Sequence, residues 1–382
     1  MANAFVKPNV IINTVLGMLQ GELVLPHFVW KDGLGDFAGK YNDTITIRIP
    51  QPTIAHSRAL RAVGSARNMT VSDLTETTID VKLTDVVYNL VALTDEEREL
   101  DLRSFATDVL PRQVRAVSSD LEFGVSETIR TAPYTEVHSV AADAIWNGVI
   151  AARRQLNEAH VPVEGRVLLI GSAVEEALLL DNRFVRYDSA GQAGASRLVN
   201  ATIGRLAGYD VVVVDTIPHG AAYLFHPTAF VMVTRAPGRP ISNTVAVSSV
   251  GSENGVALRW LGDYDSSLTT DRSLVDTWVG YKAVVDPDPG FVRAARIQLK
   301  ATSVTIGNEG ALTAGAGANH TRQLSLIDSN GDDRADDATS WVSSDPTKAT
   351  VVDGLLTGVA AGSTTITATV DGVSDTYAVT VS

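Results

Sequence analysis

The chain has 382 residues, of which 45% are hydrophobic and 20% are charged, so it is long enough for two or three domains with their own hydrophobic cores. It contains no cysteine, which excludes disulfides, thiolate nucleophiles and cysteine-ligated metal sites and fits synthesis in a reducing cytoplasm. The formal net charge of -13 argues against dedicated DNA or RNA binding, because gripping phosphates requires clustered lysine and arginine.

Residues 1–36 are predicted to form an N-terminal arm. They are weakly patterned, contain Pro8 and Pro26, and include a turn-rich stretch at 31–35. They lack a basic start followed by a long apolar run, and no stretch of the chain reaches 18 apolar residues in a row. We therefore expect neither a signal peptide nor a membrane span.

An extended β loop is predicted over residues 37–93. Strict alternation at 44–49 and again at 78–83 indicates two strands, each with apolar residues on one face. A more apolar run at 86–93 is assigned to the same two-stranded excursion. The apolar positions of the two alternating strands are the candidate assembly interface: Ile45, Ile47, Ile49, Ile79, Val81 and Leu83.

Helices are predicted over residues 94–135, which would form the spine of the molecule. Thr94 and Glu97 have capping-box spacing, and Pro111 suits the first position of a further helix. Over 111–131, apolar residues recur every three or four positions, which indicates an amphipathic helix with one buried face. That stripe consists of Val114, Val117, Leu121, Val125 and Ile129.

An α/β domain is predicted over 136–255. Helices at 143–159 and 174–180 alternate with β-branched runs at 166–170 and 210–214, and more strand is expected within 221–234. Such short continuous apolar runs are typical of a sheet that is covered on both faces. Residues 256–285 would return the chain to the region of the spine.

A linker is predicted at 286–290, where alternating prolines disfavour helix. Residues 291–382 are expected to form a separate all-β sandwich. Asp-Gly pairs at 353/354 and 371/372 lie between alternating runs, as two-residue hairpin turns require.

No catalytic set is evident, and we expect no enzyme and no cofactor. Ser172 follows Gly171, but the second glycine of a nucleophile elbow is missing. One acidic segment places Asp328, Asn330, Asp332 and Asp336 at positions 1, 3, 5 and 9 of a calcium loop. Asp333 and Thr339 stand where such a loop needs glycine and glutamate. A solvated loop is favoured, and a weak calcium site is the alternative.

The order of arm, long two-stranded loop, long helix, α/β domain and returning strand resembles the major capsid proteins of tailed phages. Stretches 39–47, 156–170, 203–211 and 258–281 carry this resemblance to the Hong Kong 97-like coat proteins. Separately, Trp341–Pro346 and Gly354–Gly362 resemble the bacterial group 2 immunoglobulin-like domain. The resemblance implies an α+β capsid fold over about residues 1–285 with a C-terminal all-β immunoglobulin-like sandwich.

The same resemblance implies a structural function. Copies of the chain would form pentamers and hexamers, with scaffolding and portal proteins as further partners, in a shell that encloses packaged DNA without binding it specifically. The protein would be made in the cytoplasm of a host bacterium and reside in the virion. The C-terminal domain would be displayed outside for weak adhesion to glycans. The alternative function is a bacterial or phage-tail adhesin built around that domain.

Overall fold

The structure is a computed structural model, and it describes residues 8–31, 44–50, 55–61, 63–73, 76–97, 109–181, 205–240, 246–286, 290–315 and 319–382. The chain divides into two compact units. The first unit comprises Met1–Pro133 and Pro227–Val292, and the second comprises Tyr134–His226 and Arg293–Ser382. Each unit is therefore assembled from segments that are distant in the sequence.

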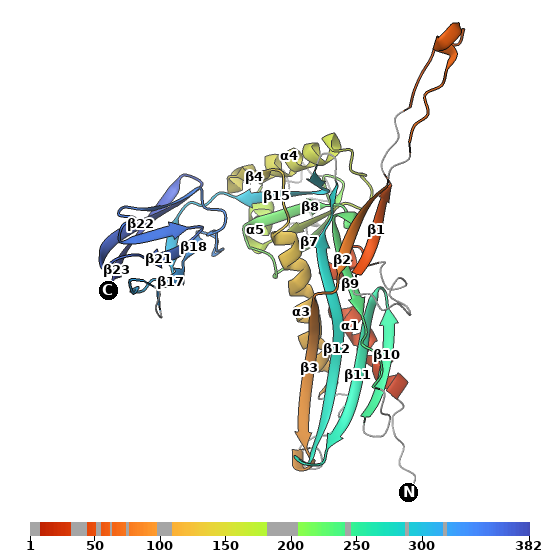
Figure 1. The fold of residues 1–382 in the computed structure, drawn as a ribbon, viewed down its shortest axis with the longest axis vertical. Helices are drawn as coiled ribbons and strands as arrows, with labels where there is room; N and C mark the ends of the chain where they lie inside the picture. The colour runs from red at the N-terminus through yellow and green to blue at the C-terminus, as the bar shows by residue number, and fades with distance from the viewer. Residues whose placement is uncertain are drawn as a thin grey trace. The chain divides into compact units, whose positions relative to one another are not determined.

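The first unit contains an antiparallel sheet in the order β10-β11-β12-β3, with β9 also paired to β12 (Figure 1). The bounds of its strands are β3 (Asp85–Thr94), β9 (Phe230–Arg235), β10 (Ala246–Glu253), β11 (Val256–Asp265) and β12 (Thr270–Ala283). At the turn between β10 and β11, Asn254 and Gly255 both adopt positive φ angles, as a two-residue hairpin of this kind requires.

The predicted amphipathic helix is confirmed as α3 (Leu110–Arg130), which packs along β3 and β12 (Figure 1). All the apolar residues of its predicted stripe are buried. The predicted capping box is also formed, since Thr94 and Glu97 exchange side-chain to backbone hydrogen bonds of 3.0 and 3.3 Å. The residues that follow, 98–108, lie outside the described residues.

The N-terminal segment differs from the predicted arm. Pro8–Glu22 form helix α1, and Leu25–Phe28 form the 3-10 helix η1. Helix α1 packs on β10 and α3. Its buried residues Ile12, Val15, Leu16 and Leu19 have helical spacing, so the segment belongs to the core of the first unit.

The predicted pair of alternating strands is confirmed as β1 (Thr44–Pro50) and β2 (Glu76–Lys82), which are antiparallel with Ile45 opposite Val81 and Ile47 opposite Ile79. The 3-10 helix η3 (Gly64–Arg67) lies in the loop between them. The run at 86–93 is not part of this excursion. It forms β3, which pairs with β12 along its whole length, because strand propensity does not specify a partner.

The second unit begins with an α/β part, residues 134–226 and 293–299, built on a sheet in the order β4-β15-β8-β5-β7-β6. Strands β4 and β15 are parallel, as are β5 and β7, whereas β8 is antiparallel to β15 and β5. Helix α4 packs on β4 and β15, and α5 on β8. The bounds are β4 (Val137–Val140), η5 (Ala142–Ala144), α4 (Ile145–Glu158), β5 (Val167–Ile170), α5 (Ser172–Leu180), β6 (Arg205–Leu206), β7 (Tyr209–Val213), β8 (Ala221–Phe225) and β15 (Ala294–Leu299).

Two boundaries differ from the sequence prediction. Strand β9, which follows η6 (Pro227–Ala229), pairs with β12 in the first unit rather than with the α/β sheet. Strand β15 lies between β4 and β8, so 291–299 do not belong to the C-terminal domain. Of the predicted linker, residues 287–289 lie outside the described residues, and Asp286 belongs to β13 (Val285–Asp286), which pairs with β14 (Phe291–Val292).

Residues 300–382, called the C-terminal domain below, form an all-β structure with its own core. Its sheets are β16-β18, β17-β21-β20 and β19-β22-β23. Both predicted Asp-Gly turns are confirmed, with positive φ at Asp353 and Asp371. The bounds are β16 (Val304–Gly307), β17 (Thr321–Gln323), β18 (Ser325–Asp328), β19 (Ser340–Ser343), β20 (Ala349–Val352), β21 (Leu355–Gly358), β22 (Gly362–Val370) and β23 (Val373–Val381).

Candidate assembly surfaces

The loop between β1 and β2 carries exposed apolar side chains. The described residues of 55–73, called the loop tip, lead away from β1 and β2 in Figure 1. Large hydrophobic side chains of the loop tip are nearly fully exposed: Leu60 96%, Val63 84%, Met69 77% and Val71 85%. These exposed apolar side chains make the loop tip a candidate contact surface.

The loop tip is also basic, although the chain as a whole is acidic. Arg58, Arg61 and Arg67 are all exposed, whereas Asp73 is the acidic residue of the same segment. A basic, apolar element on a chain of net charge -13 is suited to contact an acidic surface.

A second exposed apolar surface lies on β3. Val86, Tyr88 and Leu90 alternate along this strand and are 55%, 65% and 53% exposed. The intervening Val87 is buried, so the strand presents one face to the core and the other to solvent. Acidic residues stand at both ends of the strand, with Asp85 at its start and Glu96 just after it.

The predicted interface residues differ in how far they are buried within their own chain. Val81 is completely buried against Val231, Val233 and Val284 of its own chain, so it is not available to a neighbour. Ile79 and Leu83 are half-buried against the same cluster. The side chains of Ile45, Ile47 and Ile49 lie outside the described residues, and only their backbone register is defined.

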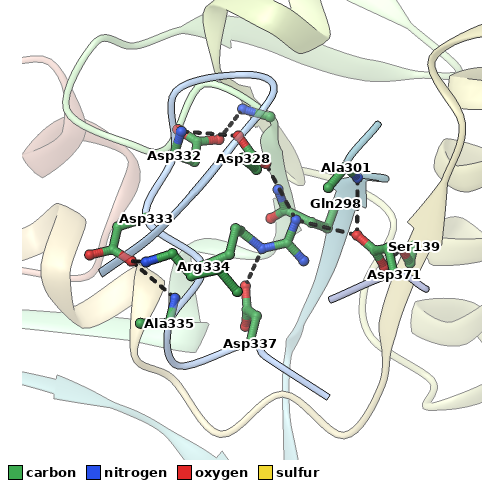
Figure 2. Close-up of polar contacts among 12 residues, drawn as sticks. Ser139, Gln298, Ala301, Asp328, Asp332, Asp333, Arg334, Ala335, Asp337 and Asp371 are labelled. Atoms are coloured by element: carbon green, nitrogen blue, oxygen red, sulfur yellow. Dashed lines mark hydrogen bonds and ion pairs between the residues drawn. The ribbon is translucent and has the colours of Figure 1, made fainter. Parts of the chain in front are cut away.

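The acidic segment for which a solvated loop was favoured, with a weak calcium site as the alternative, is organised by hydrogen bonds. Asp328 accepts the backbone N–H groups of Asn330 and Asp332 at 2.7 and 3.1 Å, and Arg334 lies 3.5 Å from its other oxygen (Figure 2). Across the described part of the chain, no group of three metal-ligating side chains comes together. The weak calcium site at Asp328, Asn330, Asp332 and Asp336 stays a prediction.

Instead, this loop contacts the α/β part. The two carboxylate oxygens of Asp332 accept the backbone N–H groups of His219 and Gly220, each at 2.6 Å. Asp337 accepts two hydrogen bonds from Arg296 of β15, at 3.0 and 2.5 Å. The sequence favoured a solvated loop, whereas in the structure Asp332 and Asp337 have partners in the α/β part.

The pKa values of Asp332 and Asp337 are shifted by burial and by these hydrogen-bond partners. Burial raises the pKa of Asp332, although the two backbone N–H groups oppose this. Burial also disfavours the charge on Asp337, but Arg296 and Arg334 outweigh it and hold the pKa of Asp337 below its ordinary value.

Ser172 and His219 lie within hydrogen-bond distance of each other, next to backbone groups that are already paired. The Ser172 hydroxyl lies 2.8 Å from His219 Nδ1. However, the Asp332 carboxylate binds the backbone N–H of His219 rather than its ring. The N–H groups of Ala173 and Val174, which could otherwise stabilise an oxyanion, donate to the His219 carbonyl.

Solved structures share this fold. A chain of Mycobacterium phage Che8 matches with a TM-score of 0.52 and 16% identity, over 72% of this chain and 90% of that one. A capsid structure of cyanophage P-SCSP1u matches with a TM-score of 0.50 and 10% identity, over 68% and 84%. The chain has the Hong Kong 97-like capsid fold. The predicted α+β fold class is thereby confirmed.

The C-terminal part of this capsid-fold chain has a separate relationship. The family of bacterial Ig-like domains (group 2) matches residues 300–381, as the sequence predicted. A comparison with curated proteins finds no match. Among the described helices, none is sufficiently long and apolar to cross a membrane.

Proposed function

We propose that this chain is the major capsid protein of a tailed phage, which self-assembles through pentamers and hexamers into an icosahedral shell around DNA. The observation that carries the proposal is the exposed loop tip, with its apolar residues Leu60 and Val71, on a chain with a capsid fold. An icosahedral shell requires contacts between copies of the chain, which a single copy cannot make by itself.

The proposed contact joins the loop tip of one copy to the outer face of β3 in the next. Both surfaces are apolar, and the basic loop tip complements the acidic ends of β3. The two surfaces differ, so the contact is heterologous, and heterologous contacts close into rings when the rotation permits. Burying each large apolar side chain contributes about 1.5–3 kcal/mol, which repetition around a ring multiplies.

The other proposed partners follow from the same role. Scaffolding and portal proteins would assist assembly, and DNA would be enclosed without specific binding, because a net charge of -13 repels phosphates. The protein would be made in a host bacterium and reside in the virion. The C-terminal domain would lie on the outer surface, where weak adhesion to glycans gains strength from copy number.

An adhesin, bacterial or from a phage tail, is the second candidate. The match of residues 300–381 to the Ig-like family favours it. That reading leaves residues 1–299 without a role, whereas the capsid proposal uses them.

The test replaces Leu60 and Val71 by glutamine and follows assembly by negative-stain electron microscopy. We expect a folded chain that forms no closed shells. The matched control is Ser57→Gln with Ser65→Gln, which places the same residues at exposed polar positions of the loop tip and should assemble. Normal shells from the Leu60→Gln, Val71→Gln chain would contradict the proposed contact.

A further inference from the structure

The C-terminal domain is attached to the α/β part by more than the covalent chain. The contacts come from residues 328–337, called the docking loop below, and from Asp371 (Figure 2). They join elements on both sides of the domain boundary at residue 300.

Asp332 makes the most specific of these contacts. Its side chain is buried, and its two oxygens accept consecutive N–H groups from the loop between β7 and β8. That loop is held from its other side, because the His219 carbonyl accepts the N–H groups of Ala173 and Val174 at the start of α5. Asp332 therefore binds a loop whose backbone is held in place by α5.

Gly220 shows how closely the two parts approach. A Cβ at this position would lie 2.9 Å from Asn330 Nδ2 and 3.1 Å from Asp332 Oδ2. The absence of a side chain at Gly220 lets the docking loop reach the backbone.

An arginine network lies next to Asp332. Arg296 of β15 and Arg334 of the docking loop both bind Asp337, and the two guanidinium side chains are only 12% and 6% exposed. Arg334 also reaches the Leu299 carbonyl at 3.4 Å. Desolvated charges of this kind are costly when a partner is removed, so the network favours the docked arrangement.

Asp371 supplies a separate point of contact. It lies in the turn between β22 and β23, and it accepts the hydroxyl of Ser139, in β4, at 2.9 Å and the Ala301 N–H at 3.1 Å. The connection itself is restrained as well, since the Lys300 N–H donates to Val140 at 2.8 Å. Contacts at Asp332, Asp337 and Asp371 together define an orientation.

We propose that the docking loop fixes the C-terminal domain to the α/β part in one orientation, with Asp332 as the principal positioning residue. The C-terminal domain therefore has a fixed orientation relative to the α/β part, and it does not move freely on a flexible linker. In a shell, this fixed orientation would make every copy present the same face of the domain, and that consequence rests on the proposed function. The docking itself does not rest on the proposed function, and it is tested on unassembled chains.

The experiment uses the absence of cysteine from the sequence. Glu176→Cys on α5 and Ser374→Cys on β23 are exposed positions for spin labels on either side of the boundary. Pulsed electron paramagnetic resonance of the full-length monomer, diluted with unlabelled chain, then reports the distance distribution between the labels. We expect one narrow distribution. Asp332→Ala combined with Asp337→Ala should broaden it about twofold or more, because the remaining contacts, at Lys300 and Asp371, do not hold the docking loop against the α/β part.

Glu309→Ala is the control, because it removes an exposed carboxylate of the same domain away from the contacts and should leave the distribution narrow. Gly220→Ala approaches the contact from the α/β side and should also broaden it. A broad distribution in the unsubstituted chain would overturn the proposal whether or not the variants fold. So would a narrow distribution in the folded Asp332→Ala, Asp337→Ala chain.

Discussion

Arg259 and Asp276 face each other across β11 and β12, and the guanidinium donates two hydrogen bonds to the carboxylate at 2.9 and 2.5 Å. The side chains are 16% and 6% exposed, so both charges are largely removed from water. Such a pair adds little over a well-packed apolar pair, but losing one partner leaves a buried charge uncompensated. The sheet of the first unit therefore depends on both residues being present.

Asp276→Ala should lower the free energy of unfolding by about 3–5 kcal/mol, measured by urea denaturation of the monomer. Glu158→Ala is the control, because Arg154 and Glu158 form an ion pair that is 73% and 68% exposed and should contribute less than about 1 kcal/mol. Equal effects of the two substitutions would show that the Arg259–Asp276 pair is solvated.

Leu121→Ala should cost about 2–5 kcal/mol, since Leu121 is fully buried on α3 and its loss leaves a cavity. Phe123 is 61% exposed on the same helix, and Phe123→Ala should change stability by less than about 0.5 kcal/mol. Denaturant melts of the two variants compare the faces of α3 directly. A Leu121→Ala cost below about half a kcal/mol would place the stripe at the surface.

Glu122 should make stability depend on pH. Its carboxylate accepts the backbone N–H groups of Val24 and Leu25, the latter at 3.0 Å, and burial raises its pKa although these donors oppose the change. A carboxyl whose pKa is raised by folding binds protons more readily in the folded chain. Its contribution to stability therefore grows as pH falls through the window above the ordinary value of 4.5.

Comparison with Glu122→Gln isolates this effect. As the pH falls from about 7 to about 5, the free energy of unfolding of the unsubstituted chain should increase relative to that of Glu122→Gln. Urea midpoints across this range provide the measurement. A difference that stays constant with pH would show that the pKa of Glu122 is not raised.

Tyr88→Gln should impair shell formation without unfolding the monomer, because it removes the largest apolar group from the outer face of β3. Leu268→Gln is the control, since Leu268 is 67% exposed at the β11–β12 turn and outside the proposed contact. Electron microscopy counts shells and circular dichroism checks the fold. If Tyr88→Gln assembles as well as Leu268→Gln, the neighbour packs elsewhere.

Truncation should separate the α/β part from the C-terminal domain. A chain ending at Asp288 lacks β15, which lies between β4 and β8, and should misfold. A chain ending at Lys300 keeps the sheet and should fold and form shells. Residues 300–382 contain their own core around Leu326, Ile366 and Val379 and should melt cooperatively alone. A folded but unassembled 1–300 chain would show that the C-terminal domain takes part in shell contacts.

The helices and turns could be predicted from the sequence because they depend on neighbouring residues. The stripe from Val114 to Ile129 repeats with the helical period, and Asp353-Gly354 adopts the positive φ angles that its turn requires. Helix α1 had the same spacing, from Ile12 to Leu19, but Pro8 and Pro26 within residues 1–36 favoured an arm. In fact Pro8 stands at the first position of a helix, where proline is tolerated.

Only the tertiary structure decided which strands pair and which charges are buried. Strand was predicted within 221–234, which includes β9, and 291–382, which includes β15, was assigned to the sandwich. The sequence could not show which sheet either strand joins, because a strand's partners can lie anywhere in the chain. The docking loop is the clearest case. Asp332 and Asp337 resemble solvated carboxylates until folding brings the His219 N–H and the Arg296 guanidinium within 3 Å of them. Burial of a charge depends on partners remote in sequence, and no local pattern encodes their distance.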